Sequence, residues 1–172
     1  MDLASTVRGV PDFPIEGILF YDITTLLKNS TALKSSIDQF THRYQDSGID
    51  MIVGIESRGF IFGMPLAYQL GVGFVPVRKP GKLPAETIAE SYTLEYGSNT
   101  LEIHVDAIQA GQKVLVVDDL LATGGTAKAT CSLIEKLGGE VIGLAFAIEL
   151  NFLNGRQRLS GYDIFSLIRY DE

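Results

Sequence analysis

The chain carries one stretch whose residue types and spacing suit an anionic ligand, VLVVDDLLATGGT at residues 114–126. An apolar run ends in two carboxylates, Asp118 and Asp119, and a glycine-rich turn then opens a helix. Successive glycines let backbone N–H groups converge on an anion, and the start of a helix adds partial positive charge there. The hydroxyls of Thr123 and Thr126 can donate further hydrogen bonds to phosphate oxygens. The predicted phosphate site is therefore the turn formed by Ala122, Thr123, Gly124, Gly125 and Thr126.

Two carboxylates beside this turn would repel a ligand that consisted of phosphate alone. A ligand with a phosphate at one end and hydroxyls nearby resolves the conflict, because carboxylates accept hydrogen bonds from ribose hydroxyls. We therefore interpret Asp118 and Asp119 as residues that bind the diol of a 5-phosphorylated ribose. The alternative is purely structural, with TGGT as a turn and helix cap and the acidic pair merely ending a strand. The close succession of strand, acidic pair and glycine turn disfavours that alternative.

Two common nucleotide-binding motifs do not explain the segment. GxxxxGK[ST] does not occur in the chain, and no GxGxxG follows a predicted strand. The segment instead resembles the type I phosphoribosyltransferases, and VLVVDDLLATGGT matches the adenine-specific branch of that family. The resemblance implies that the turn holds the 5-phosphate of phosphoribosyl pyrophosphate and that Asp118 and Asp119 hold its ribose hydroxyls.

A second candidate anion site, ESRGF, follows the predicted strand 51–55. Arg58 suits a diphosphate because its planar guanidinium binds oxygens in pairs, although it could simply pair with a surface carboxylate. A dense basic cluster, RKPGK at residues 78–82, follows another predicted strand, and its alternative is a solvated loop. The resemblance implies that Arg58 stabilises the leaving charge, that the ESRGF loop often holds a cis peptide, and that Arg78 reaches across a dimer interface. The implied pyrophosphate-binding residues are Ser57, Arg58, Arg78, Lys79 and Lys82.

Residues 86–97 resemble the mobile lid of these enzymes, which folds over the bound substrates. The resemblance places Glu95 near the base, where it is a catalytic group that assists proton movement. It places Tyr96 in the lid as a residue that excludes water, which would otherwise capture the reacting sugar carbon. From the residues alone, Glu95 would be read as an exposed carboxylate.

The N-terminal segment DFPIEGILFYDIT resembles the hood that contacts adenine in this family. The resemblance implies backbone contacts around Leu19 and Tyr21, with Phe20 stacked on the base and Leu150 packed on its other side. Many relatives carry a basic residue where Tyr21 stands, so its side chain is not expected to supply charge. The alternative for Phe20 is an ordinary place in the core.

These residues need a scaffold, and the rest of the chain predicts one. Short apolar runs rich in β-branched residues alternate with helical patterns at residues 31–45 and 126–137, which indicates an α/β fold. We expect an open, mainly parallel twisted sheet flanked by helices, with ligands at the carboxyl ends of its strands. Residues 78–92, with two prolines and little periodicity, are expected to form a long exposed loop. The predicted strands are Met51–Ile55, Phe74–Val77, Lys113–Val117, Val141–Ile148 and Ile164–Ile168.

Length and composition set the outer limits. A chain of 172 residues predicts a single domain at 1–172, with the hood at about 1–30 and the lid at about 78–97. A net charge of −7 disfavours nucleic-acid and membrane-surface partners. The single cysteine, Cys131, forms no internal disulfide, and with no signal-like start the expected location is cytoplasmic. His42 and His104 lack partners at metal-ligand spacing, so no protein-built metal site is expected.

The resemblance covers about residues 13–170 and implies a complete activity. This is the conversion of adenine and phosphoribosyl pyrophosphate to AMP and pyrophosphate in purine salvage. It implies Mg²⁺ held mainly through substrate oxygens and water, and a homodimer. Two alternatives stay open: the same chemistry on hypoxanthine, guanine or xanthine, and a non-catalytic sensor of phosphoribosyl pyrophosphate.

Overall fold

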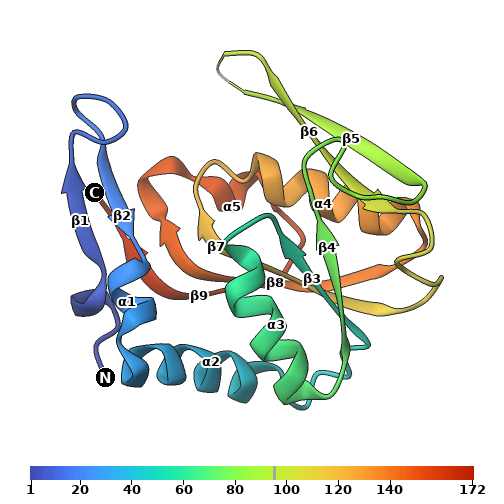
Figure 1. Cartoon of the computed structure of the whole chain (residues 1–172), viewed down its shortest axis with the longest axis horizontal. Coiled ribbons are helices and arrows are strands. Elements are labelled where there is room, and N and C mark those ends of the chain that lie inside the picture. Colours follow the sequence, from blue (N-terminus) through green and yellow to red (C-terminus); the bar gives the residue numbers. More distant parts are fainter. Residues whose placement is uncertain (95) are drawn as a thin grey trace.

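The computed structural model describes residues 1–94 and 96–172 of the chain. Within these residues the centre of the fold is a five-stranded parallel sheet with the strand order β4-β3-β7-β8-β9 (Figure 1). The expected parallel α/β sheet is therefore confirmed. Its strands are β3 (Met51–Ile55), β4 (Gly73–Val77), β7 (Lys113–Leu121), β8 (Glu140–Leu150) and β9 (Ile164–Tyr170).

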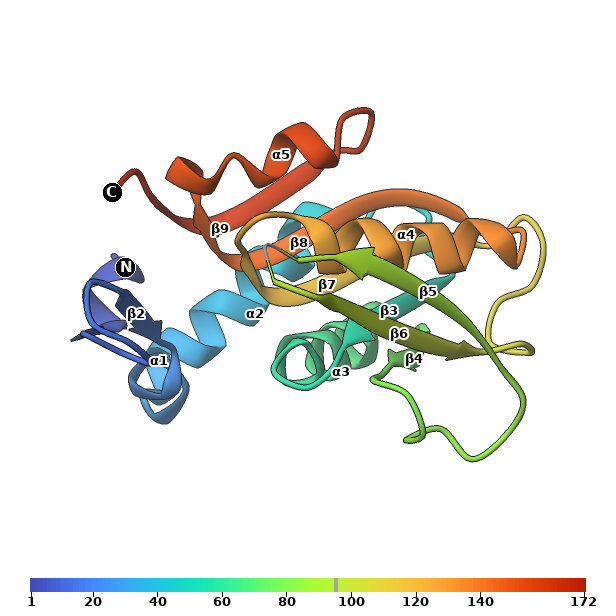
Figure 2. The ribbon, with the colours of Figure 1, turned by 90° about the horizontal axis from the view of Figure 1, so that it is seen from above.

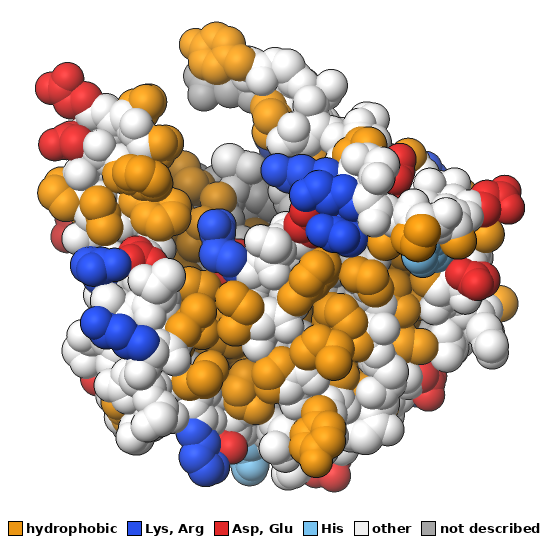
Figure 3. All heavy atoms as spheres, in the orientation of Figure 1, with side chains coloured by type: hydrophobic (Ala, Val, Ile, Leu, Met, Phe, Trp, Pro, Cys, Tyr) orange, Lys and Arg blue, Asp and Glu red, His pale blue; other side chains and the backbone are white. Residues whose placement is uncertain are grey.

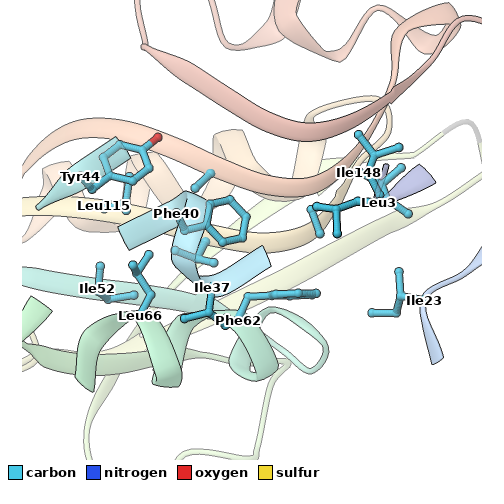
Figure 4. Packing of buried hydrophobic residues seen from close by; sticks show 14 of the residues in the cluster. Leu3, Ile23, Ile37, Phe40, Tyr44, Ile52, Phe62, Leu66, Leu115 and Ile148 are labelled. Carbon is cyan, nitrogen blue, oxygen red and sulfur yellow. The ribbon is translucent and has the colours of Figure 1, made fainter. Parts of the chain in front are cut away.

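Both faces of this sheet are covered, because successive side chains of a strand point to opposite faces. Ile52 of β3 packs with Phe40 of α2 in one hydrophobic cluster, whereas the adjacent Val53 packs with Ile134 of α4 in a second cluster. Figure 4 shows the first cluster, in which α2 and α3 lie against the sheet. In the described residues no helix is both long and apolar enough to cross a bilayer. The covering helices are α2 (Ser30–Tyr44), α3 (Gly59–Leu70) and α4 (Gly125–Lys136).

Strand β7 is longer than the sequence predicts. The apolar run ends at Val117, but the ladder with β8 continues through the pairs Leu120–Ile148 and Leu121–Glu149. Asp118 therefore lies inside the strand, opposite Phe146 of β8, and not at the strand's end. The expectation of a strand that stops before the acidic pair was wrong, because β8 extends to Leu150 and supplies backbone partners.

The expectation of one long exposed loop at residues 78–92 was also wrong. Residues from this segment form β5 (Thr87–Thr93), which pairs antiparallel with β6 (Ser98–His104). Ile103 of β6 is buried in the second hydrophobic cluster, and β5 contacts α4. Figure 2 shows this hairpin lying along α4. Alternating apolar and polar residues in β6 carried the strand signal, which the prolines and glycine of the preceding segment obscured.

The N-terminal segment forms a small hairpin at one end of the sheet (Figure 1). Its strand β2 is tied to β9 because the Tyr21 ring stacks on Tyr170 with centroids 3.8 Å apart. The Tyr21 hydroxyl also donates to the main-chain oxygen of Glu172, 3.0 Å away. The C-terminus therefore helps to hold the N-terminal hairpin. The remaining elements are η1 (Ala4–Thr6), β1 (Arg8–Pro11), β2 (Leu19–Asp22), α1 (Thr24–Lys28), η2 (Asn151–Leu153) and α5 (Gly155–Arg158).

Candidate active site

The residues expected to do chemistry meet where the neighbouring strands β3 and β7 run into α3 and α4. Carboxyl ends of parallel strands share one edge of a sheet, so these loops are brought together by topology alone. A cavity of about 510 Å³ lies there. It is lined by Glu56, Ser57, Arg58, Lys79, Lys82, Asp118, Asp119, Leu120, Ala122 and Thr126.

The acidic pair lines this cavity and is largely buried. Asp118 and Asp119 are 9% and 7% exposed. Burial, and then the adjacent negative charge of Asp119, raise the pKa of the Asp118 carboxyl well above its usual value. Asp118 Oδ1 accepts the backbone N–H of Asp119 at 2.8 Å. The protein thus holds two carboxylates side by side, and the surroundings of Asp118 disfavour its charged form.

Arg58 connects the ESRGF loop to this pair. Its Nε lies 2.5 Å from Oδ2 of Asp119. Burial alone would lower the pKa of Arg58, but the charges of Asp119 and Asp118 outweigh it and raise that pKa. Arg58 therefore binds a buried carboxylate of the candidate site. It does not simply pair with a surface carboxylate, which was the alternative reading of its sequence position. The Glu56–Ser57 peptide bond in the same loop is cis.

The basic cluster is organised by Glu56, a residue that sequence reasoning did not single out. Glu56 forms ion pairs with Arg78, at 3.3 Å, and with Lys82, and it accepts the backbone N–H of Lys79 at 2.9 Å. Burial would raise the pKa of Glu56, but these bonds outweigh it and lower the pKa to about 2. Figure 3 shows Lys and Arg side chains gathered beside a hollow between the two peripheral hairpins. Lys79 and Lys82 line the same cavity as the acidic pair.

The glycine turn has the shape expected of a phosphate-binding loop. Gly124 has φ +85°, and a Cβ there would lie 2.6 Å from the carbonyl oxygen of Gly155, so only glycine fits. A Cβ on Gly155 would in turn lie 2.4 Å from the Ala122 carbonyl oxygen. The turn is therefore braced by α5, through a glycine that no motif in the sequence pointed to. A small cavity of about 70 Å³ is enclosed by Asp118 and residues 120–127.

The segment expected to form the lid contains β5 and leads into β6 of the β5–β6 hairpin. Tyr96 is 88% exposed and, with Thr93, Leu94, Thr123 and Arg158, lines a cavity of about 810 Å³. This cavity reaches the phosphate turn through Thr123. Glu95, the expected catalytic carboxylate, lies outside the residues that the structure describes.

The expected adenine-contacting residues are placed in two groups. Leu150 is buried at the end of β8, in the cluster against which Tyr21 and Ala122 also pack. Phe20 points to the face of β2 opposite to that of Tyr21, and its ring contacts the Phe13 ring edge-on with centroids 5.1 Å apart. The Leu19 residue is 48% exposed. Phe20 is half-buried, so it is not the core aromatic of the structural alternative.

The ligand sets that proteins use to bind metal ions are groups of His, Cys, Asp and Glu side chains. In residues 1–94 and 96–172, His, Cys, Asp and Glu side chains nowhere gather in groups of three or more that could hold an ion. The acidic pair beside the basic cluster still fits an ion whose other ligands are substrate oxygens and water.

Comparison with known proteins decides the family. The family model for the phosphoribosyl transferase domain matches residues 22–168. The chain belongs to the phosphoribosyltransferase family. It is 63% identical over 169 residues to the adenine phosphoribosyltransferase of Chloroflexus aurantiacus, covering 98% of each protein.

Solved structures of phosphoribosyltransferases agree with the fold. The crystal structure of adenine phosphoribosyltransferase from Thermoanaerobacter pseudethanolicus matches with a TM-score of 0.95 at 54% identity, covering 98% of each chain. The Saccharomyces cerevisiae enzyme, complexed with D-2,5-dideoxy-2,5-imino-altritol 1,6-bisphosphate and adenine, matches with a TM-score of 0.91 at 45% identity, covering 96% of each chain. The resemblance drawn from VLVVDDLLATGGT is thus confirmed. The protein is an enzyme of the pentosyltransferase class.

The raised pKa of Asp118 generates a prediction for Asp118→Asn. A carboxyl whose pKa is raised by folding contributes stability below its unfolded-state pKa, and this stability is lost as pH rises through the folded-state value. Asparagine removes the buried charge and keeps an oxygen for the Asp119 N–H. We expect the ligand-free variant to melt above wild type at pH 8, by about 2–4 °C for each 1 kcal/mol gained. The difference should shrink at pH 5.

Thermal unfolding followed by circular dichroism at both pH values measures this difference. Asp38→Asn is the control, because Asp38 is exposed on α2, where it forms an ion pair with Lys34. A melting temperature of Asp118→Asn at or below that of wild type at pH 8 would contradict the assignment of Asp118 as a destabilising buried charge.

Proposed function

We propose that the protein transfers the 5-phosphoribosyl group of phosphoribosyl pyrophosphate to adenine, giving AMP and pyrophosphate in purine salvage. The observation that carries the proposal is the convergence of a glycine turn, a buried acidic pair and a basic cluster on adjoining cavities. These three features match the phosphate, the diol and the pyrophosphate of one substrate. Relatives at about 60% identity that are named adenine phosphoribosyltransferase support adenine as the acceptor.

The phosphate turn and the acidic pair would fix the sugar. Backbone N–H groups at the start of α4 have no partners inside the helix and are available to the 5-phosphate. The hydroxyls of Thr123 and Thr126 add donors, and Asp118 and Asp119 accept the ribose hydroxyls. Such fixed points at both ends of the ribose would orient its anomeric carbon toward the base.

The basic residues would hold the leaving pyrophosphate. The anomeric carbon gains a bond to N9 of adenine and loses its bond to the pyrophosphate oxygen, so negative charge develops on the leaving group. Arg58 and Lys79 stabilise that charge, with Ser57, Arg78 and Lys82 as further ligands. Bound Mg²⁺, held mainly by substrate oxygens and water, would neutralise part of the pyrophosphate charge.

Base binding and closure complete the proposed site. Adenine would lie between Phe20 of the hood and Leu150, with backbone contacts around Leu19 and Tyr21. The segment at residues 78–97, which includes β5, would act as the lid, with Tyr96 excluding water and Glu95 taking up the proton that leaves N9. Hood, sheet and lid form one domain in this proposal. We place it in the cytoplasm, because its multiply charged substrate does not cross a bilayer unaided.

An assay of product formation tests the proposed function. Purified protein is given phosphoribosyl pyrophosphate, Mg²⁺ and one base at a time: adenine, hypoxanthine, guanine or xanthine. We expect AMP from adenine and no nucleotide from the other three bases. Product from another base would overturn the base assignment while keeping the chemistry. Tight binding of phosphoribosyl pyrophosphate with no product from any base would favour a sensor.

A homodimer is the second part of the proposal. Helix α3 carries Ile61, Met64 and Tyr68, which are 39%, 51% and 84% exposed. Residues at this spacing lie on one side of a helix, and exposed apolar patches mark sites of association. Figure 3 shows hydrophobic side chains gathered over this part of the surface. Arg78, close to the end of β4, is suited to reach across such an interface.

The interface prediction concerns Tyr68→Glu. A charge in the α3 patch should shift the protein from dimer to monomer, because the carboxylate would lose its water in the interface. Sedimentation velocity at micromolar concentration measures the change. The control is Ile15→Glu, at a residue 66% exposed in the turn of the N-terminal hairpin. A monomeric wild type, or a variant that stays dimeric, would count against this interface.

A further inference from the structure

The base of the β5–β6 hairpin touches the phosphate turn at one polar contact. The hydroxyl of Tyr92, in β5, lies 2.8 Å from Oγ1 of Thr126, and both residues are half-buried. The Tyr92 ring rests on the turn itself, since a Cβ on Gly125 would lie 3.0 Å from a ring atom. The position of this hydroxyl is therefore set by packing as well as by the hydrogen bond.

In the free protein either the Tyr92 or the Thr126 hydroxyl could donate the hydrogen bond between them. A phosphate bound at the turn would fix which of the two is the donor. A phosphate dianion at the turn only accepts hydrogen bonds, so Thr126 must give it its single O–H. The lone pairs of Thr126 Oγ1 are then free to accept, and the Tyr92 O–H is the donor beside them. A donor chain from tyrosine to threonine to phosphate forms, in which each bond polarises the next.

We propose that Tyr92 is a positioning residue for the 5-phosphate, acting through the Thr126 hydroxyl, and this rests on the proposed function. Tyr92 would direct the Thr126 proton at the phosphate and hold the threonine rotamer. The same bond joins the phosphate turn to the hairpin that would carry the lid, since Leu94 and Tyr96 follow in the chain. An occupied phosphate site would thereby order the base of the lid.

Other contacts allow the hydroxyl to be removed without displacing the hairpin. Glu90 of β5 forms an ion pair with Lys136 of α4, and Ile88 and Tyr92 pack against the second hydrophobic cluster. Tyr92→Phe keeps the ring against Gly125 and loses only the O–H. The variant should therefore fold and melt as wild type does.

The test measures binding of ribose 5-phosphate and of adenine by calorimetry, together with steady-state kinetics. For Tyr92→Phe we expect ribose 5-phosphate affinity to fall and KM for phosphoribosyl pyrophosphate to rise, each about three- to tenfold, as for one lost hydrogen bond. Adenine KM and kcat should be unchanged. In Thr126→Val, adding Tyr92→Phe should cause no further loss, because Tyr92 acts through Thr126.

Hydrogen exchange supplies a readout that does not depend on turnover. Ribose 5-phosphate should slow exchange of the β5 amides in wild type and do so less in Tyr92→Phe. The matched control is Tyr162→Phe, which removes another tyrosine hydroxyl bonded to α4, at 2.5 Å from Glu135.

The outcomes separate two failures. Wild type that binds no ribose 5-phosphate and forms no AMP would overturn the proposed function. An active wild type with Tyr92→Phe binding ribose 5-phosphate equally well would overturn the role of Tyr92 alone. Equal losses for adenine and ribose 5-phosphate, or additive losses with Thr126→Val, would also overturn it.

Discussion

The rest of this site depends on one constraint, which is that two carboxylates lie side by side with little access to solvent. Asp118 and Asp119 are both buried within β7, where burial and the neighbouring negative charge of Asp119 raise the pKa of the Asp118 carboxyl. Among the described residues, Arg58 supplies a cation to Asp119, and the backbone N–H of Asp119 donates to Asp118. A ribose diol would supply the remaining donors, so the pair is better satisfied with ligand than without it. In the proposed complex the protein would give up some stability of its free state in order to bind the sugar.

The same arrangement explains the charges around it. Arg58 forms an ion pair with Asp119, and Glu56 forms ion pairs with two cations of the loop after β4. Acidic and basic groups are therefore paired in the ligand-free protein. These ion pairs hold the long Arg and Lys side chains in position. On substrate binding, the same side chains would bind phosphate oxygens in place of the carboxylates. The parallel sheet makes this possible, because β3 and β7 are neighbours and deliver both loops to one edge.

Much of this could be predicted from the sequence, and the limits have physical causes. A site for a phosphorylated sugar could be predicted from VLVVDDLLATGGT, because the strand, the acidic pair and the glycine turn are contiguous in the chain. The braces at Gly155 and Glu56 were missed, since close backbone approach and the choice of ion-pair partner arise only when distant segments meet. The β5–β6 hairpin was missed because its weak alternation follows a segment rich in proline and glycine. Roles given to Leu19, Phe20 and Glu95 still rest on resemblance.

The central claim is that Asp118 and Asp119 bind the hydroxyls of a 5-phosphorylated ribose. It is tested most directly by calorimetric titration of the wild-type protein with ribose 5-phosphate and with 2-deoxyribose 5-phosphate. The two ligands share the phosphate and differ by one hydroxyl. Hydrogen bonds to charged groups are worth about 1.5–3 kcal/mol, so we expect ribose 5-phosphate to bind at least about tenfold more tightly. Equal affinity for the two sugars would contradict the claim.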